Sequence, residues 1–413
     1  MKAAELRNKF REYMLEQGHI FLPRASLVSD DAVLFTTSGV HPIIESCLEG
    51  CHPLGDKLAS IQMCVRTGDI DEVGDQTHYT SFEMLGYWSL GAFGTERAIE
   101  IAFQFLTRLG IRPEHLTATV FAGDELVPTD ELAEDLWHRL GVSTTRLGRS
   151  DNWWGPVSES GPCGPDTEIF YWTGEEQPPK DPDPTKDNRW VEIWNIVSMK
   201  YSFTGAVYEE LPIPVIDTGG GFERILSILN SNSSAYQTDL FSLPSGQLGD
   251  EQRSRIVADH IRTAVRMLAD GVVPSSQKHG AVLRRLVRRA VVQCGLVENT
   301  IELLTALALD FIECDGSEYE HINANRLQVI RLLDQEVRSS INSLGRGQLW
   351  FEQLTASCLS IIDGELAFRL QSEKGCPIEL TKILAGGRNL AIDLVGFERA
   401  RNRHRSDSKK RAS

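Results

Sequence analysis

The sequence predicts an α+β domain over residues 1–245 and an all-helical domain over residues 250–398. Three observations support this division. Strand-like and helix-like segments are mixed in the first part of the chain, a linker-like stretch with the segments SNSSAYQ and LPSGQLGDEQ follows at 228–253, and the later patterns are almost all helical. A chain of 413 residues is also too long for one ordinary core, so two or three domains are expected.

The first domain is expected to combine helices and strands with loops rich in glycine and proline. The first helix is amphipathic, because Leu6, Phe10 and Met14 recur on one face. Glycine and proline break up residues 155–166, and residues 174–188 form a polar, Pro-rich loop. The expected elements are helices at 3–18, 95–109, 130–140 and after Gly221, and strands at 33–37, 59–65, 117–122, 190–202 and 213–217.

The second domain is expected to consist of helices, because apolar residues recur there with helical spacing. It should end in a basic, Ser-containing tail at 399–413, which we expect to be disordered. The expected helices lie at 255–270, 280–293, 299–313 and 323–345.

Composition and charge exclude several classes of protein. The net charge of −16 argues against a protein that coats nucleic acid without sequence preference, although a local basic surface remains compatible with it. No apolar stretch approaches the ~20 residues of a membrane helix, and the N-terminus lacks the apolar run of a signal peptide. The eight cysteines form no C-x-x-C pair, so reduced structural thiols and no zinc are expected. A cytoplasmic protein without a membrane partner is the resulting expectation.

The first candidate for chemistry is a strand–loop–strand pattern that carries an arginine and an aromatic residue. Arg66 ends one apparent strand, an acidic loop follows, and residues 78–84 begin the returning strand. An arginine in this place can hold a phosphate through two hydrogen bonds, and Phe82 on the return strand can stack on a purine. A surface hairpin with an ion pair is the alternative interpretation.

The second candidate is a run of three glycines between a strand and a helix, in Asp217–Arg224. Glycines allow the backbone to approach a ligand closely, and Arg224, one turn into the helix, can meet a terminal phosphate. The run matches neither the P-loop nor the dinucleotide-binding fingerprint. A glycine-rich strand–helix turn without a ligand is the alternative interpretation.

Together, the arginine strand and the Gly-Gly-Gly-x-Glu-Arg helix resemble class II aminoacyl-tRNA synthetases. The resemblance to the alanyl-tRNA synthetase family extends over nearly the whole chain, and it implies an antiparallel sheet flanked by helices. The stretches that resemble this family in order and spacing are RTGDIDEVGDQTHYTSFEMLGYWSLG (66–91), DNWWGPVSESGPCGPDTEIFY (151–171), VEIWNIVSMKY (191–201), VIDTGGGFERI (215–225) and VADHIRTAVRMLADGVVPS (257–275).

The resemblance implies a site for ATP. Arg66 would hold the α-phosphate, and Arg224 would clamp the far end of the triphosphate and cover the base. Phe82 would stack on adenine. The other implied nucleotide contacts are His78, Met84 and Gly221.

The resemblance also implies an alanine pocket beside the nucleotide. Asp217 would pair with the α-ammonium group, Val197 would limit side-chain size, and Gly219 would leave room for the substrate. Glu192 is the candidate Mg²⁺ ligand, since a hard cation that bridges phosphates needs few protein carboxylates. The other implied pocket residues are Trp154 and Asn195.

The implied reaction needs no general base. Attack of a carboxylate on an α-phosphate joins two anions, and the barrier falls when cations neutralise the phosphate and the nucleophile is held in line. The carboxylate itself is already ionised at pH 7. A purely structural role remains the alternative for Trp154, as a core aromatic, and for Glu192, as a strand carboxylate.

Selection among small amino acids is expected to be imperfect. One methylene in an apolar pocket is worth only ~1–3 kcal/mol, so glycine and serine should be confused with alanine. The family's editing domain follows segments that resemble IDGELAFRL (362–370), GCPIELT (375–381) and GFERARNRHR (396–405), and this sequence stops there. No editing activity is therefore expected of it.

A cluster of arginines in the expected helix 280–293 is the candidate contact with tRNA. Arginines four residues apart repel each other, which favours a counter-anion such as nucleic-acid phosphate. Pairing with acids of this acidic protein is the alternative. The arginines are Arg284, Arg285, Arg288 and Arg289, and the residues expected to add to this side are His260, Arg262 and Arg266.

The sequence departs from the family at two places that read the acceptor stem of tRNA. Residues 276–281 replace an Asn-rich, Arg-Gly-Tyr run, and Glu379 replaces an aspartate. Ala92 stands where an aspartate is typical, and Gly219–Gly221 replaces a Gly-Met-Gly run. The activation pocket is thus expected to be intact and the tRNA-reading surface altered.

Three hypotheses follow. The leading one is ATP-dependent activation of alanine and its transfer to tRNA(Ala), without editing. The second is an adenylate-forming paralogue that transfers alanine or another small amino acid to a small molecule, a peptide or a carrier protein. The third is a non-catalytic tRNA-binding or regulatory module. The family's usual dimerisation element lies outside this sequence, so a monomer is compatible with each of them.

Overall fold

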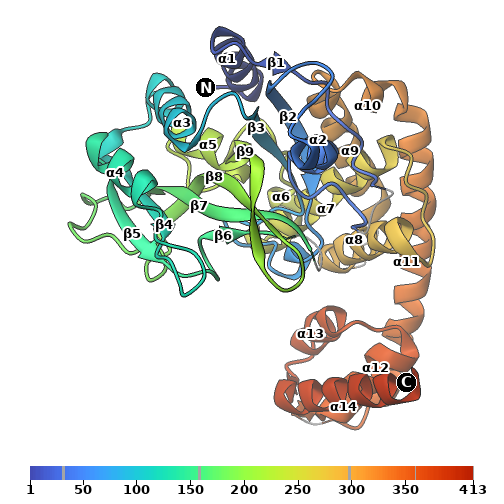
Figure 1. Ribbon diagram of the computed structural model, residues 1–413. Helices are drawn as coiled ribbons and strands as arrows, with labels where there is room; N and C mark the ends of the chain where they lie inside the picture. Colours follow the sequence, from blue (N-terminus) through green and yellow to red (C-terminus); the bar gives the residue numbers. More distant parts are fainter. Residues whose placement is uncertain (30–32, 157–159, 296–298, 359, 413) are drawn as a thin grey trace. The chain divides into compact units, whose positions relative to one another are not determined.

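The computed structural model describes residues 1–29, 33–156, 160–295, 299–358 and 360–412, with the backbone alone at Ser245 and 405–412. The chain divides into two compact units (Figure 1). The sheet unit comprises Met1–Asp69 and Gln76–Phe241, and the helical unit comprises Ile70–Asp75 and Ser242–Ser413. A short piece of the N-terminal half of the chain therefore belongs to the helical unit.

Over the described residues, the sheet unit is built on one nine-stranded sheet. The strand order is β1-β2-β3-β9-β8-β7-β4-β5, with β6 paired to β7. The β1–β2 and β4–β5 pairs are parallel, and the other pairs are antiparallel. This arrangement confirms the α+β class expected from the sequence. The strands are β1 (Ile20–Phe21), β2 (Lys57–Val65), β3 (Ser81–Leu90), β4 (Leu116–Phe121), β5 (Ser143–Leu147), β6 (Trp153–Trp154), β7 (Gly161–Trp172), β8 (Trp190–Phe203) and β9 (Tyr208–Gly221).

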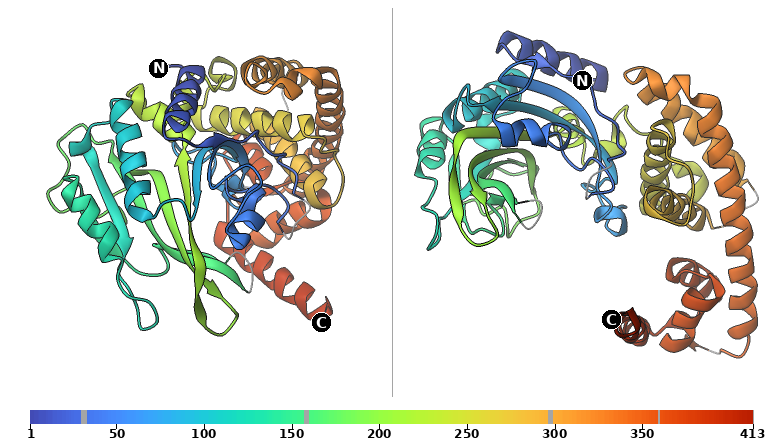
Figure 2. Two further views of the ribbon diagram at one scale, coloured as in Figure 1. Left: turned by 45° about the horizontal axis from the view of Figure 1, so that its top comes forward. Right: turned by 45° about the vertical axis from the view of Figure 1, so that its right-hand side comes forward.

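Helices α1 and α3 cover one face of this sheet (Figure 2). Trp194 of β8 packs against Phe10 of α1 and Phe105 of α3, with ring centroids 6.3 and 6.0 Å apart. All three rings are buried, so the hydrophobic core of the unit lies on this face. The helices of the unit are α1 (Ala3–Glu16), α2 (Ile44–Glu49), α3 (Thr95–Arg108), α4 (Glu131–Arg139) and α5 (Phe222–Leu229).

Two sequence-based expectations for the sheet unit are wrong. Residues 33–37 form no strand, because Phe35 makes only an isolated bridge to Val28. The segment 155–166, expected to be broken, contains the start of β7, where a register shift takes Gly164 and Pro165 out of the pairing with β8. The shift lets the strand continue past a proline that cannot donate to the ladder. Residues 157–159 of this segment lie outside the described residues.

The helical unit contains the four long helices that the sequence predicts, as α7, α8, α9 and α11, and one short strand pair that it does not predict. None of its described helices, nor any in the sheet unit, is long and apolar enough to span a lipid bilayer. The elements are α6 (Ser245–Leu248), α7 (Glu251–Ala269), α8 (Lys278–Cys294), α9 (Thr300–Gly316), α10 (Glu320–Ala324), α11 (Arg326–Leu354), β10 (Ile361–Ile362), α12 (Gly364–Lys374), α13 (Ile378–Gly386), β11 (Ala391–Ile392) and α14 (Leu394–Ala412).

The chain beyond residue 399, expected to be a disordered tail, continues helix α14 to Ala412. The start of this helix is anchored by apolar contacts. Phe397 and Ala400 are buried, and the ring of Phe397 lies 6.1 Å from that of Phe368 in α12. The charged composition of the tail conceals this anchor.

His260, Arg262 and Arg266 do not belong to a basic surface, as expected from the sequence, because all three are buried in α7. Arg266 donates to both carboxylate oxygens of Asp315 in α9 at 2.7 and 3.0 Å. Arg262 lies 3.6 Å from the same carboxylate. A buried arginine requires such a partner, and the pairing places these charges in the core of the helical unit.

A buried ion pair between α1 and β3 gives a testable contribution to stability. Arg7 donates to both oxygens of Glu83 at 2.7 Å, and both side chains are buried. Arg7→Leu should lower the free energy of unfolding by about 3–5 kcal/mol, because Glu83 stays buried without this cation. Urea-induced unfolding followed by tryptophan fluorescence measures the change.

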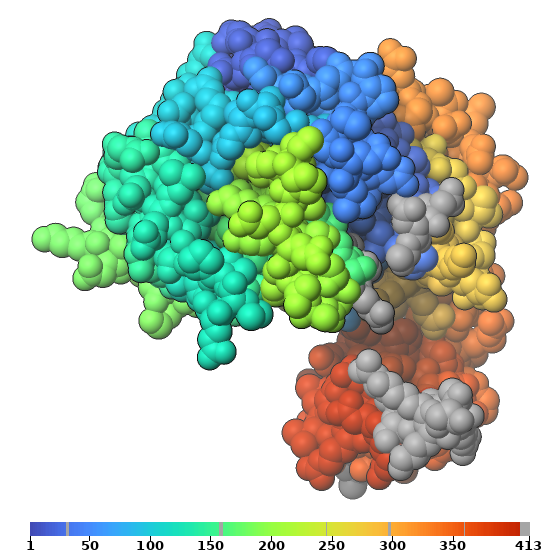
Figure 3. Space-filling view, viewed as in Figure 1, coloured from blue at the N-terminus to red at the C-terminus, as the bar shows by residue number. Residues whose placement is uncertain are grey.

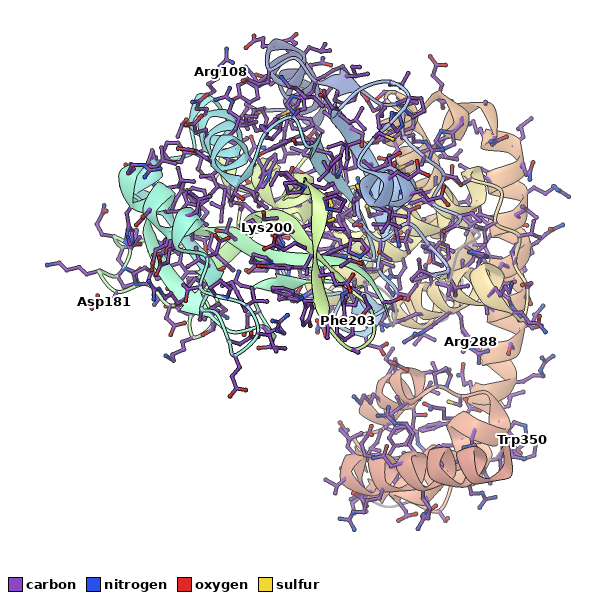
Figure 4. All side chains as sticks on the ribbon, viewed as in Figure 1. Arg108, Asp181, Lys200, Phe203, Arg288 and Trp350 are labelled. Atoms are coloured by element: carbon purple, nitrogen blue, oxygen red, sulfur yellow. The ribbon has the colours of Figure 1, made fainter. Side chains whose placement is uncertain are left out.

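The exposed pair of Arg108 (Figure 4) and Glu16 is the matched control. Arg108→Ala should lower stability by less than about 1 kcal/mol, because exposed pairs are screened by water. The double variant Arg7→Leu/Glu83→Leu should lose less than Arg7→Leu alone. Equal losses for Arg7→Leu and Arg108→Ala would contradict the assignment.

Candidate functional site

A cavity of about 550 Å³ lies on the face of the sheet opposite α1 and α3. Side chains alternate along β3, so Phe82 and Met84 point into the cavity while Glu83 points toward Arg7 of α1. The cavity is lined by Arg66, Asp69, Thr77, His78, Tyr79, Phe82, Met84, Glu192, Gly219, Gly221, Glu223 and Arg224. The structure thus brings together the arginine strand and the glycine run, which lie far apart in the sequence.

The strand register sets the order of residues across this face. Met84 of β3 pairs with Gly221 of β9, and Trp88 pairs with Asp217. On the other side of β9, Gly219 pairs with Asn195 and Asp217 with Val197 of β8. The tip of the β8–β9 hairpin, yellow-green in Figure 3, is exposed at the molecular surface. The opposite end of the hairpin carries the site residues.

Arg66 and Phe82 form one side of the cavity. The guanidinium carbon of Arg66 lies 5.0 Å from the centroid of the Phe82 ring, and its Nε donates to the carbonyl oxygen of Thr37 at 3.3 Å. Cation–π contact orients the guanidinium while its other nitrogens face solvent or a ligand. A flat group that enters here would meet both an aromatic face and a cation.

Arg224 and Glu192 form the other side. Arg224 lies in the first turn of α5, and its Nη1 donates to the Glu192 carboxylate at 2.9 Å and to the Glu192 carbonyl oxygen at 3.0 Å. Both side chains are about one-third exposed, at 28% and 36%. An anion that enters the cavity can therefore compete with Glu192 for this guanidinium.

The glycine run allows the backbone of β9 to pass close to Met84. A Cβ atom at Gly219 would lie 2.9 Å from the Sδ atom of Met84, which also accepts a hydrogen bond from the backbone nitrogen of Gly39 at 3.2 Å. A side chain at Gly219 would clash with Met84 unless Met84 moved. The glycine thus leaves room for Met84 in the lining of the cavity.

Asp217 lies deeper on the same strand. Its Oδ1 accepts a hydrogen bond from Trp88 Nε1 at 2.6 Å. Burial raises the pKa of Asp217 to about 7, although the hydrogen bond from Trp88 acts in the opposite direction. The carboxyl is thus poised to change charge near neutral pH.

The remaining residues expected in an amino-acid pocket lie around Asp217 rather than in the lining of the larger cavity. Val197 is buried in the apolar cluster that includes Trp88 and Cys47, and Trp154 packs against this cluster. Asn195 is half-buried and reaches Asp166 of β7 through its amide nitrogen at 3.4 Å. The surroundings of the Asp217 carboxylate are therefore largely apolar.

Two acids of β7, the buried Asp166 and the partly buried Glu168, were not predicted from the sequence. Burial raises the pKa of Asp166 to about 7, and burial together with the Glu192 charge raises the pKa of Glu168 to about 9. Asp166 accepts from the amide nitrogens of Asn152 and Asn195. The signal was their alternate spacing along a strand, which the nearby glycines and prolines obscured.

The arginines of α8 all have partners within the helical unit. Arg284 pairs with Glu336 at 3.0 Å, and Arg285 pairs with Asp71 at 2.7 Å. Arg288 (Figure 4) donates to the carbonyl oxygen of Gly375 at 2.7 Å. Arg289 donates to the carbonyl oxygen of Ile70 and lies 2.9 Å from His260 Nε2.

These arginines also line a second cavity, of about 1100 Å³, that belongs wholly to the helical unit. Ser276 and Glu379, where the sequence was expected to depart from the family, lie in its lining. The lining consists of Asp71, Ser275, Ser276, Ala281, Arg284, Arg285, Arg288, Arg289, Val292, Glu336, Ser339, Ser340, Ser343, Pro377 and Glu379. Arg284 and Arg285 pair with carboxylates of the protein, and the cavity that they line can still admit a ligand.

A largely antiparallel sheet that carries an arginine, a stacking aromatic and a Gly-Gly-Gly-x-Glu-Arg turn into a helix defines a core of the class II synthetase type. The family model described as "tRNA synthetases class II (A)" matches residues 5–413. The chain belongs to this family.

Curated relatives agree with this membership. The chain is 38% identical to "Alanine--tRNA ligase" of Treponema pallidum (strain Nichols), over 99% of this chain and 72% of the relative. It is 38% identical to the protein of the same name from Borrelia hermsii (strain HS1 / DAH), over 99% of this chain and 73% of the relative. For that of Rubrobacter xylanophilus (strain DSM 9941 / JCM 11954 / NBRC 16129 / PRD-1), the identity is 36% over 98% of this chain and 49% of the relative.

A solved pyrrolysyl tRNA synthetase from Desulfitobacterium hafniense is also similar. It is 13% identical with a TM-score of 0.34, covering 57% of this chain and 71% of that chain. This similarity is too distant to bear on function.

The close packing of Gly220 against Trp194 predicts how substitutions in the glycine run affect stability. Gly220→Ala should cost about 1–3 kcal/mol, because its Cβ would lie 2.5 Å from the buried ring of Trp194, which has no room to move. Gly221→Ala should cost less, because the nearest atom would be Cδ of Arg224 at 3.5 Å. Melting temperatures from circular dichroism compare the two variants, and equal losses would contradict the packing described.

Proposed function

We propose that this chain activates alanine with ATP and transfers it to tRNA. One observation carries the proposal: Arg66, Phe82 and Arg224 line a single cavity, and Asp217 lies two residues before Gly219 of that lining. The relatives named alanine–tRNA ligase support alanine as the amino acid and tRNA as the acceptor.

The cavity suits a nucleoside triphosphate. Phe82 offers an aromatic face to the adenine, with Met84 and His78 nearby. Arg66, held over Phe82, holds the α-phosphate, and Arg224 holds the far end of the triphosphate close to the backbone of Gly221. The guanidiniums of Arg66 and Arg224 therefore bind the phosphate chain at two points.

The Arg224–Glu192 ion pair opens when this nucleotide binds. Phosphate oxygens take the place of Glu192 at the guanidinium, which leaves the Glu192 carboxylate facing the phosphates. That carboxylate, already next to a cation in the cavity, fits a Mg²⁺ ion, which takes oxygen ligands. When bound, the ion neutralises phosphate charge, while Arg224 and Arg66 do the same through hydrogen bonds.

Alanine fits beside the nucleotide at Asp217. The carboxylate pairs with the α-ammonium group, and Val197, opposite Asp217 on β8, limits the length of the side chain. Trp154 and Asn195 close the pocket, and Gly219 leaves space for the substrate carboxylate to reach the α-phosphate.

The chemical step then requires positioning and charge neutralisation only. An oxygen of the alanine carboxylate forms a bond to the α-phosphorus, and the bond to the pyrophosphate oxygen breaks. Arg66 stabilises the charge that develops on the α-phosphate oxygens. The electrons of the broken bond leave with pyrophosphate, so no proton has to be moved in this step.

The cavity of the helical unit is proposed to receive phosphates of the acceptor tRNA, through Arg284, Arg285 and Arg288. Ser276 and Glu379 also lie in its lining. Charging of total tRNA with labelled alanine tests the transfer step. Alanine activation without any charging would favour a non-tRNA acceptor.

Alanine-dependent exchange of pyrophosphate into ATP tests the activation step. The chain should support exchange, and Asp217→Asn should lower kcat/KM for alanine by about a hundredfold or more, the cost of leaving the ammonium without its counter-charge. The Kd for ATP, measured by equilibrium dialysis, should stay nearly unchanged. The proposal fails if no amino acid supports exchange, or if Asp217→Asn turns over alanine as the wild-type chain does.

The pKa of Asp217 predicts how alanine use depends on pH. Because that pKa is about 7, the carboxylate is lost as pH falls below about 7, and kcat/KM for alanine should fall about tenfold per unit there. Trp88→Phe removes a hydrogen bond to the ionised form and should shift this profile to higher pH. Exchange rates from pH 5.5 to 8.5 would reveal the profile, and a profile unchanged by Trp88→Phe would argue against Asp217 as its origin.

A further inference from the structure

The loop between β2 and β3 belongs to both units of the chain. Asp69 and the residues from Gln76 onward belong to the sheet unit, whereas the tip, Ile70–Asp75, belongs to the helical unit. Asp69 and His78 line the nucleotide cavity. The tip is therefore joined directly through the backbone to Asp69. On the other side of the loop, the carbonyl oxygen of Gln76 accepts hydrogen bonds from Tyr79 and Ser234 of the sheet unit.

The tip is held in the helical unit by buried apolar side chains and by arginine donors. Ile70 and Val73 are 0% and 2% exposed. Arg289 of α8 donates from Nη1 to the carbonyl oxygen of Ile70, and Arg255 of α7 donates to that of Asp75 at 3.4 Å. The residue that directly follows Asp69 is thus fixed by Arg289.

A chain of hydrogen bonds fixes Arg289 in turn. Its Nη1 lies 2.9 Å from Nε2 of His260, and Nδ1 of His260 lies 2.9 Å from Oδ2 of Asp259. An arginine can only donate, so Nε2 must accept and Nδ1 must carry the proton that Asp259 accepts. Burial lowers the pKa of His260, which keeps the imidazole in this neutral form.

Arg285 makes a weaker contact with the same tip. Its ion pair with Asp71 joins side chains that are 50% and 71% exposed. Exposed pairs contribute little, and an anion that enters the cavity beside α8 can take Arg285 without leaving a buried charge behind. Arg289 is half-buried, and its bond to a backbone carbonyl holds the loop itself rather than a mobile side chain.

We infer that Arg289 is a positioning residue for adenylate formation rather than a ligand of the acceptor. It holds the carbonyl of Ile70 and thereby fixes Asp69, the preceding residue, in the lining of the nucleotide cavity. This role rests on the proposed function of that cavity. It adds a contribution of the helical unit to the activation step, before any acceptor binds.

Exchange measured without tRNA tests this role, together with equilibrium dialysis of ATP. Arg289→Met should raise KM and Kd for ATP about tenfold, the loss expected for one charge-assisted hydrogen bond. The KM for alanine should stay within about twofold, since Asp217 lies on another strand. Arg289→Lys keeps one donor and should recover part of the loss.

Further variants separate positioning from damage to the fold. His260→Gln keeps an acceptor for Arg289 and should raise the KM for ATP less than His260→Leu, which removes it. Val73→Ala loosens the tip without touching Arg289 and should also raise the KM for ATP. Arg338→Ala is the matched control, because Arg338 is exposed and pairs with Asp334 on its own helix. It should leave exchange unchanged.

The outcomes are distinguishable. Unchanged KM and Kd for ATP in folded Arg289→Met, with loss in tRNA charging alone, would overturn the inference and assign Arg289 to the acceptor. Equal rises in the KM for ATP and for alanine would overturn it as general damage. If Arg289→Met does not fold, the KM and Kd for ATP of His260→Leu and Val73→Ala test the inference instead. No exchange by the wild-type chain would sink the proposed function, while ATP dialysis would still decide the role of Arg289.

Discussion

The register that joins β3 to β9 and β9 to β8 is the constraint on which the site depends. It places Met84 opposite Gly221 and Val197 opposite Asp217. Because side chains alternate between the faces of a sheet, the same hydrogen bonds put Trp194 into the core against α1 and α3. A slip of one residue would exchange the two faces and bury the site residues. Packing of the core and geometry of the cavity therefore share one cause.

The charged groups of the site differ in exposure, because Arg66 is exposed, Arg224 and Glu192 are partly exposed, and Asp217 is buried. The Arg66 and Arg224 guanidiniums both line the cavity, where they can meet an incoming anion. Asp217 is buried with a pKa of about 7, so a ligand ammonium that lowers this pKa also creates the charge that binds it. In the proposed site, binding of the amino acid and ionisation of Asp217 are thus one coupled event. The arrangement favours a zwitterion over a neutral molecule of the same size.

The sequence predicted what depends on local patterns and failed where distant partners decide. The arginine strand and the glycine run around Arg66 and Arg224 have strong local signatures, and the structure brings them into one cavity. Arg266 was assigned to a surface, because nothing near it in sequence reveals Asp315 on another helix. The acids of β7 were missed because Gly164 and Pro165 suggest a break, whereas a register shift lets the strand pass them. Periodicity reports which residues are apolar, but not which charge has a partner.

The partners of the arginines of α8 include carboxylates and backbone carbonyl oxygens. Four arginines so close together suggest a single phosphate-binding stripe, yet their partners differ in kind. Arg284 and Arg285 pair with carboxylates, which an anion can replace, whereas Arg289 donates to a backbone carbonyl and is braced by His260. A guanidinium that holds the main chain cannot be released without freeing a loop, and that loop leads directly to the nucleotide cavity. Helix α8 thus joins the surface proposed for the acceptor to Asp69 of the cavity proposed for ATP, and the connection runs through the backbone rather than through a shared ligand.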